Sequence, residues 1–188
     1  MLWLLFGKHW RAKPAPETDY GPGGTTLRSE FLSYGLIGAL AIGLLIAAFT
    51  DFRRRQIDNW LNASIALAAP LFWWASGLSL WPGVGWQVGV ALLTFVITAA
   101  LFALRAMGGG DVKLLTALAL WIRPDHFFYL VVIMAMLGGL LTLAFGAWHI
   151  ARRQPGRVAI PYGIAISAAG ILTLIDKSLP VLGGGTAG

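Results

Sequence analysis

Long apolar runs separated by short polar or glycine-rich breaks dominate the chain. Most of these runs are long enough for a helix that rises about 1.5 Å per residue to cross a hydrocarbon core of roughly 30 Å. They cover residues 31–50, 60–80, 84–104, 127–150 and 158–175, the last with Pro161 near its start. The pattern predicts an all-α, polytopic membrane protein.

One apolar run is too short to cross a membrane. Residues 112–122 would form only about 16 Å of helix, half of a typical hydrocarbon core. A helix of that length would leave Asp111 below the membrane surface, where glycine-rich backbone is tolerated only inside protein or beside a wet cavity. We therefore expect about six transmembrane helices, of which the fourth is a short span.

The two ends of the chain lack long apolar runs. Residues 1–30 combine a short apolar start, a basic cluster and a stretch with proline and glycine, which indicate an interfacial anchor and a flexible linker. Residues 181–188 are rich in glycine and are expected to form a flexible tail. The membrane domain is expected to cover residues 31–180.

Composition supports a membrane protein and excludes other classes. Hydrophobic residues make up 57% of the chain and charged residues 12%, with a mean hydropathy of +0.73. The net charge of +6 comes from short clusters between apolar runs, which indicates membrane topology and not nucleic-acid binding. The chain has no cysteine and its 3 histidines are scattered singly, so we expect no metal site and no cofactor.

The basic residues also orient the chain. If the N-terminus lies outside, the outside loops between spans keep only Arg123 of the 14 lysines and arginines. The positive-inside rule then places Asp51 and Asp111 on the cytoplasmic side, although the basic N-terminal segment argues mildly for the reverse. The bases of the inside loops are Arg53, Arg54, Arg55, Arg105, Lys113, Arg152, Arg153 and Arg157.

Two aspartates stand out as candidate chemistry. Asp51 follows the first apolar run, and Asp111 follows a glycine turn at the start of the short one. Two neighbouring carboxylates cannot both ionise comfortably, so one stays protonated while the other acts as a base. Such a pair can activate water against a peptide carbonyl without a metal or a covalent nucleophile. The pair suggests an aspartic protease in the membrane, and either aspartate could hold the proton.

Each candidate residue also has a structural interpretation. Asp111 could cap the helix that it begins. Asp51 precedes several arginines and could be a solvated charge at the membrane interface. Lys113 could be an interfacial anchor or could hold the Asp111 loop. The glycine turn lacks the Gly-Lys-Ser/Thr ending of a phosphate-binding loop.

The aspartate segments resemble those of the type IV prepilin peptidases. Gly108-x-Gly110-Asp111 is similar to the G-x-G-D signature of that family, and Asp51 lies near the end of an earlier span. Ile57 follows Asp51 at the spacing found in the family's first-aspartate segment.

Two further positions bear on this resemblance. Pro161-Tyr162-Gly163 resembles the family's late Pro-Tyr/Phe-Gly motif, and Asn59 matches the end of the first-aspartate segment. Asp58 is a departure, because the family usually has proline before this asparagine. It adds a third acid near the site.

The resemblance implies that Asp51 and Asp111 are catalytic and remove leader peptides from prepilins on the cytoplasmic side of a bacterial inner membrane. Its partners would be the lipid bilayer and a prepilin, with its leader and N-terminal hydrophobic helix. The chain is similar to the short form associated with Flp/Tad pili, which has no methyltransferase activity. Supporting positions would be Gly108, Gly110, Lys113, Asn59, Pro161 and Gly163.

Two other classes of function stay open. A small transporter or channel would explain acids in a membrane, and it predicts that they line a continuous path to the opposite face. A non-enzymatic assembly subunit of a secretion system predicts that Asp111→Asn is harmless.

The depths of the two aspartates present a geometric difficulty. Counting residues puts Asp51 near the interface and Asp111 deeper. The carboxylates would then meet only if the first helix ends early or tilts, or if the site is filled with water.

Overall fold

The structure, a computed structural model of the 188-residue chain, describes residues 25–152 and 161–182. Helices and no strands occur in these two ranges, so the predicted all-α class is confirmed. The predicted anchor, nearly all of the linker and most of the tail lie outside the described residues.

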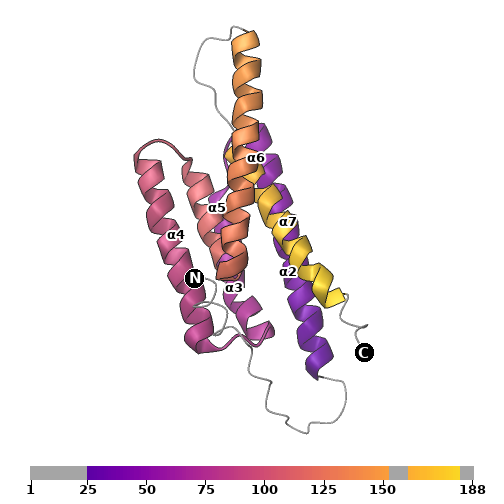
Figure 1. Cartoon of the computed structure of the whole chain (residues 1–188). Helices are drawn as coiled ribbons and strands as arrows, with labels where there is room; N and C mark the ends of the chain where they lie inside the picture. Colours follow the sequence, from indigo (N-terminus) through magenta and orange to yellow (C-terminus); the bar gives the residue numbers. More distant parts are fainter. Residues whose placement is uncertain (1–24, 153–160, 183–188) are drawn as a thin grey trace, which may run out of the picture.

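The helices follow one another with short connections (Figure 1). In chain order, the described elements are α2 (Thr25–Arg54), α3 (Asn59–Ala75), the π-helical turn η1 (Leu80–Val84), α4 (Gly85–Ala103), α5 (Gly109–Ala119), α6 (Pro124–Ala151) and α7 (Tyr162–Leu182).

Three stretches of described helix are long and apolar enough to cross a membrane: Ser29–Arg54, Leu80–Ala103 and Pro124–Ala151. The predicted half-length helix is confirmed, because α5 has 11 residues and thus spans about 16 Å. Helix α3, with 17 residues, and the apolar part of α7, Tyr162–Asp176, are also short. The total of about six spans stays a prediction.

Several helix boundaries differ from the predicted ones: α5 covers residues 109–119 instead of 112–122, and α6 begins at Pro124 instead of residue 127. Helix α2 extends beyond residues 31–50 at both ends, because a helix satisfies its own backbone and can continue into polar surroundings. Helix α3 ends at Ala75 instead of residue 80. Two residues later, Gly77 has a φ of 64°, a left-handed conformation that often ends a helix and favours glycine. Helix α7 begins at Tyr162, so Pro161 precedes the helix.

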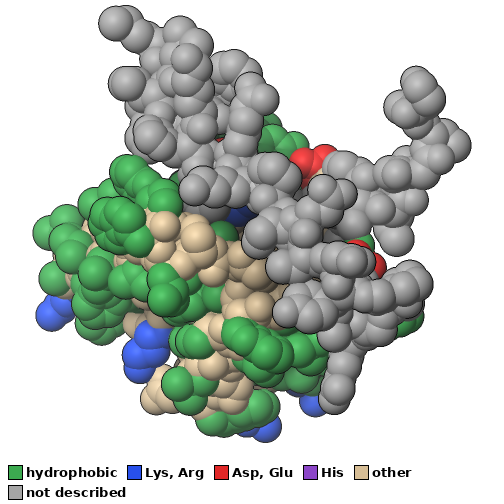
Figure 2. Space-filling model, turned by 90° about the horizontal axis from the view of Figure 1, so that it is seen from below, with side chains coloured by type: hydrophobic (Ala, Val, Ile, Leu, Met, Phe, Trp, Pro, Cys, Tyr) green, Lys and Arg blue, Asp and Glu red, His purple; other side chains and the backbone are tan. Residues whose placement is uncertain are grey.

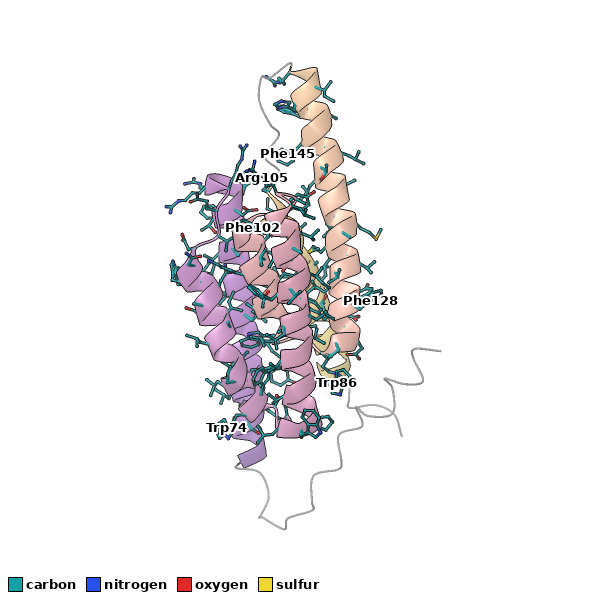
Figure 3. All side chains as sticks on the ribbon, turned by 90° about the vertical axis from the view of Figure 1, so that its left-hand side faces the viewer. Trp74, Trp86, Phe102, Arg105, Phe128 and Phe145 are labelled. Atoms are coloured by element: carbon teal, nitrogen blue, oxygen red, sulfur yellow. The ribbon has the colours of Figure 1, made fainter. Side chains whose placement is uncertain are left out.

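Helix α5 lies inside the bundle. Most of its residues are buried, and it packs against α3, α4 and α7, while α2 and α6 both pack along α7 (Figure 1). The outer surface is apolar: hydrophobic side chains cover most of the described surface in Figure 2, as expected for a protein surrounded by lipid tails. Trp74 and Trp86 lie toward one end of the bundle, and Phe102 and Arg105 toward the other (Figure 3).

Side chains from two other helices bond to the backbone just beyond the C-terminal end of α5. The Leu120 carbonyl accepts hydrogen bonds from the Trp73 indole Nε1 at 2.8 Å and from Gln87 Nε2 at 3.1 Å. The Trp121 indole donates to the Ile65 carbonyl at 2.8 Å. A helix end without water needs such donors, because each unsatisfied carbonyl in an apolar environment is costly.

We expect the two donors to Leu120 to be coupled. Trp73→Phe or Gln87→Leu alone leaves the carbonyl one partner and should lower the free energy of unfolding by about 1 kcal/mol or less. The double variant leaves it none and should cost about 1–3 kcal/mol beyond the sum. Thermal unfolding in detergent measures this, with Ser76→Ala, an exposed hydroxyl bonded to its own helix, as control. Strictly additive losses would contradict the coupling.

Candidate functional site

Asp51 lies in the last turn of α2 and faces inward. Asp51 is 5% exposed, and the buried Ala47 and Gly43 lie one and two turns before it, respectively, on the same face. The arginines that follow it are exposed. Asp51 is therefore not a solvated charge at the interface.

Asp111 is the third residue of α5 and is 8% exposed. Gly108 is the N-cap of this helix, and its backbone N–H donates to the Asp111 carboxylate. A Cβ on Gly108 would lie 2.9 Å from Asp111 Oδ2, so only glycine allows this approach. Asp111 thus helps to cap its helix, as one interpretation had it, but its burial exceeds what a cap requires.

The two carboxylates belong to one buried site. They are near enough for the charge of Asp51 to act on Asp111. The backbone N–H groups of Gly163 and Ile164, in the first turn of α7, and the more distant Arg55 stabilise the negative charge of Asp51. Oδ2 of Asp51 is buried and has no hydrogen-bond partner among the described residues. A buried acceptor of this kind is costly and is a candidate for contact with a reacting group.

Ile57 joins the starts of α5 and α7 beneath the aspartates. A Cβ on Gly110 would lie 3.2 Å from the Ile57 Cβ atom, and a Cβ on Gly163 would lie 2.9 Å from Ile57 Cδ1. A Cβ on Gly163 would also lie 2.8 Å from Asp51 Oδ2. The two glycines therefore permit close packing around Ile57, and the buried Pro161 lies directly before that contact.

The first turn of α3 holds the start of α5. Lys113 Nζ donates to Asn59 Oδ1 at 2.7 Å, so Lys113 joins the two segments that carry the motifs. Asn62 Nδ2 approaches the Gly110 carbonyl at 3.4 Å. Our sequence reasoning missed Asn62, which is 4% exposed; its signal was a polar residue inside an apolar run.

The difference in membrane depth between the aspartates stays a prediction, but both lie at the same end of the bundle. Helix α2 does not end early, and Asp51 stays within it. The start of α5 lies at the same end of the bundle, because Gly109 approaches the ring of Phe102 near Arg105 (Figure 3). Both carboxylates are therefore buried at one end of the molecule.

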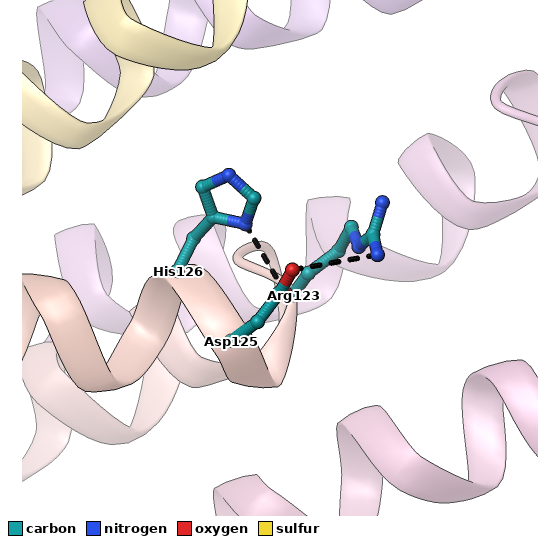
Figure 4. A network of polar contacts seen from close by, with 3 residues as sticks. All are labelled: Arg123, Asp125 and His126. Atoms are coloured by element: carbon teal, nitrogen blue, oxygen red, sulfur yellow. Dashed lines mark ion pairs between the residues drawn. The ribbon is translucent and has the colours of Figure 1, made fainter. Parts of the chain in front are cut away.

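A second polar cluster lies beyond the other end of α5. Asp125 forms ion pairs with Arg123 at 3.4 Å and with His126 at 3.1 Å (Figure 4). Asp125, His126, Tyr129 and Asp176 line a pocket of about 260 Å³. Asp125 and Asp176 are exposed, and within the described ranges no group of three His, Asp or Glu side chains could hold a metal ion.

Gly163→Ala should disturb the site directly. The new Cβ would overlap the Asp51 carboxylate, so we expect the free energy of unfolding to fall by about 1–3 kcal/mol. Gly139→Ala in α6 is the matched control: it meets open space and should be neutral or stabilise the helix by up to about 1 kcal/mol. Thermal unfolding in detergent separates the two. Equal stability of both variants would show that the start of α7 can shift away from Asp51 at little energetic cost, contrary to this prediction.

Comparison with known proteins matches the same region. Residues 38–143, more than half of the chain, match the type IV leader peptidase family. The match includes both aspartates and ends before Pro161. No curated protein and no solved structure matches the chain. With its long apolar helices and this match, the chain is a membrane protein that belongs to the type IV leader peptidase family.

Proposed function

We propose that the protein is an aspartic endopeptidase that removes leader peptides from type IV prepilins, with Asp51 and Asp111 as its catalytic pair. The observation that carries the proposal is the proximity of two buried carboxylates, from α2 and α5, whose charges interact, in a leader peptidase family member. The resemblance to the short form favours Flp/Tad-type prepilins as substrates.

The proposed chemistry needs one proton shared between two acids. One carboxylate takes a proton from water as the water attacks the peptide carbonyl, and the protonated partner donates to the developing oxyanion or to the leaving amine. Burial strengthens the repulsion between two ionised carboxylates, which favours the singly protonated pair that this reaction requires. The free Oδ2 of Asp51 supports a role in contacting the water or the peptide.

We propose that this site faces the cytoplasm from a bacterial inner membrane. Exposed bases gather at the end of the bundle that holds the aspartates, and such clusters are typical of the cytoplasmic side. The described members of this group are Arg53, Arg54, Arg55, Arg105, Lys113 and Arg152.

The burial pattern favours a peptidase over a transporter. Among residues 29–152 and 161–176, for which side-chain burial is described, Asp51 and Asp111 are the only buried ionisable residues. Asp125 and Asp176 are exposed beyond the other end of α5, and buried apolar residues such as Leu114 and Leu118 occupy the helix between the clusters. Ionisable side chains therefore do not form a continuous path through the described bundle.

Loss of either carboxylate should abolish cleavage. In vesicles that contain the protein and a candidate prepilin, Asp51→Asn and Asp111→Asn should each slow cleavage by about 10²–10⁴-fold, because each removes a proton donor or acceptor. Substrate mass at the leader junction gives the readout. Asp125→Asn is the control and should cleave normally. Full activity of Asp111→Asn would refute the dyad; full activity of Asp51→Asn alone would direct attention to Asp58.

The backbone at Asp58 already has a conformation that proline adopts. Its φ is −63° and its ψ is 136°, near the value that a proline ring imposes. Asp58 is the N-cap of α3, but its side chain makes no capping hydrogen bond. The departure from the family's usual proline therefore leaves the local bend intact.

Asp58→Pro should accordingly be tolerated. We expect unchanged cleavage and a free energy of unfolding that is unchanged or higher by up to about 1 kcal/mol, because proline restricts the unfolded chain. The cleavage assay and thermal unfolding test this. A loss of cleavage in a stably folded Asp58→Pro protein, shared by Asp58→Asn, would make Asp58 part of the catalytic site.

A further inference from the structure

Tyr162 joins the start of α7 to the middle of α6. A Cβ on Gly138 would lie 3.0 Å from Tyr162 Cε1 and 3.2 Å from its Cδ1, so the ring lies against a surface that lacks a side chain. One turn later on α6, Thr142 Oγ1 lies 3.1 Å from the Tyr162 hydroxyl. Ring and hydroxyl thus contact the same face of α6.

The Thr142 hydroxyl has two hydrogen-bond partners. It can donate its single hydrogen to the Gly138 carbonyl at 2.7 Å. In that arrangement the Tyr162 hydroxyl, at 3.1 Å, is the donor to Thr142. The result is a short chain from Tyr162 through Thr142 to Gly138, and each member fixes the orientation of the next.

This contact bears on the candidate active site through the backbone. Gly163 and Ile164 follow Tyr162 directly, and their N–H groups face the Asp51 carboxylate. A Cβ on Gly163 would already overlap Asp51, so the spacing between α7 and Asp51 tolerates little movement. Neither Gly138 nor Thr142 contacts the aspartates in any interaction that we observe.

We propose that Gly138, Thr142 and Tyr162 form a clamp between α6 and α7 that positions the Gly163 and Ile164 amides against Asp51. These three are positioning residues, and their effect on cleavage rests on the proposed function. The clamp assigns α6 a role in the active site although α6 supplies none of the proposed catalytic side chains.

The variants separate the parts of the clamp. Thr142→Val and Tyr162→Phe each remove the hydrogen bond between the helices, and Thr142→Ser keeps it. Gly138→Ala displaces the ring. Thr98→Val is the matched control, because the buried Thr98 hydroxyl bonds only to carbonyls of its own helix α4, at 2.7 and 3.4 Å.

Two measurements test the clamp: hydrogen exchange reports how firmly it anchors α7, and cleavage kinetics report its effect on the active site. Amide hydrogen exchange of the peptide covering the first turn of α7 reports anchoring without any substrate. Loss of the hydrogen bond should speed this exchange about fivefold. In cleavage of the reconstituted prepilin, kcat should fall about fivefold while KM is unchanged. The reason is that the Gly163 and Ile164 amides shift relative to Asp51, whereas the surface that binds the substrate does not change.

The expected pattern is specific. Thr142→Val, Tyr162→Phe and their double variant should behave alike, because they remove one shared bond. Thr142→Ser and Thr98→Val should match the wild type, and Gly138→Ala should have a larger effect than the loss of the hydrogen bond. Unchanged exchange in Thr142→Val would overturn the clamp.

The cleavage assay tests the positioning role separately from the anchoring of α7. Faster exchange with unchanged kcat in an active protein would overturn the positioning role. If wild-type protein cleaves no prepilin, the proposed function fails, and exchange alone then decides whether the clamp anchors α7.

Discussion

The packing of the helices around the candidate site depends on the burial of two carboxylates, Asp51 and Asp111, away from solvent. A buried charge is costly unless nearby groups compensate it, and here the compensation comes from the backbone at the starts of two helices. Helix α7 presents amides to Asp51, and α5 presents the Gly108 amide to Asp111. The close approach requires glycine at both helix starts, and Ile57 fills the space between them.

The short length of α5 is the second part of the same arrangement. A helix that begins at a buried acid and ends after 11 residues leaves carbonyls that no lipid can satisfy. Indole and amide donors from α3 and α4 bond to the Leu120 carbonyl directly after this helix. Helix α5 is therefore held at its start by the bond from the Gly108 N–H to the Asp111 carboxylate. It is held at its end by the bonds that the Leu120 carbonyl accepts.

The positions and lengths of the apolar runs predicted the helical class, the half-length helix and, to within one residue, both limits of α4, because these follow from local sequence. The two aspartates and the glycines near them could also be recognised. The burial of Asp51 could not, since residue counting gives depth along a helix but not the direction in which a side chain faces. The contact of Thr142 with Tyr162 and the proline-like backbone of Asp58 depend on tertiary packing, and no local pattern encodes them. Asn62 is marked in the sequence as a polar residue inside an apolar run, but its contact with Gly110 depends on packing.

The order of the helices has a consequence for biosynthesis. Asp51 and Asp111 are synthesised before the amides of α7, which belong to the last described helix. A nascent chain that contains α2 through α6 already carries both acids and Arg55, yet it lacks the Gly163 and Ile164 amides that stabilise Asp51. The candidate site is therefore completed only when α7, the last described helix, docks against α2.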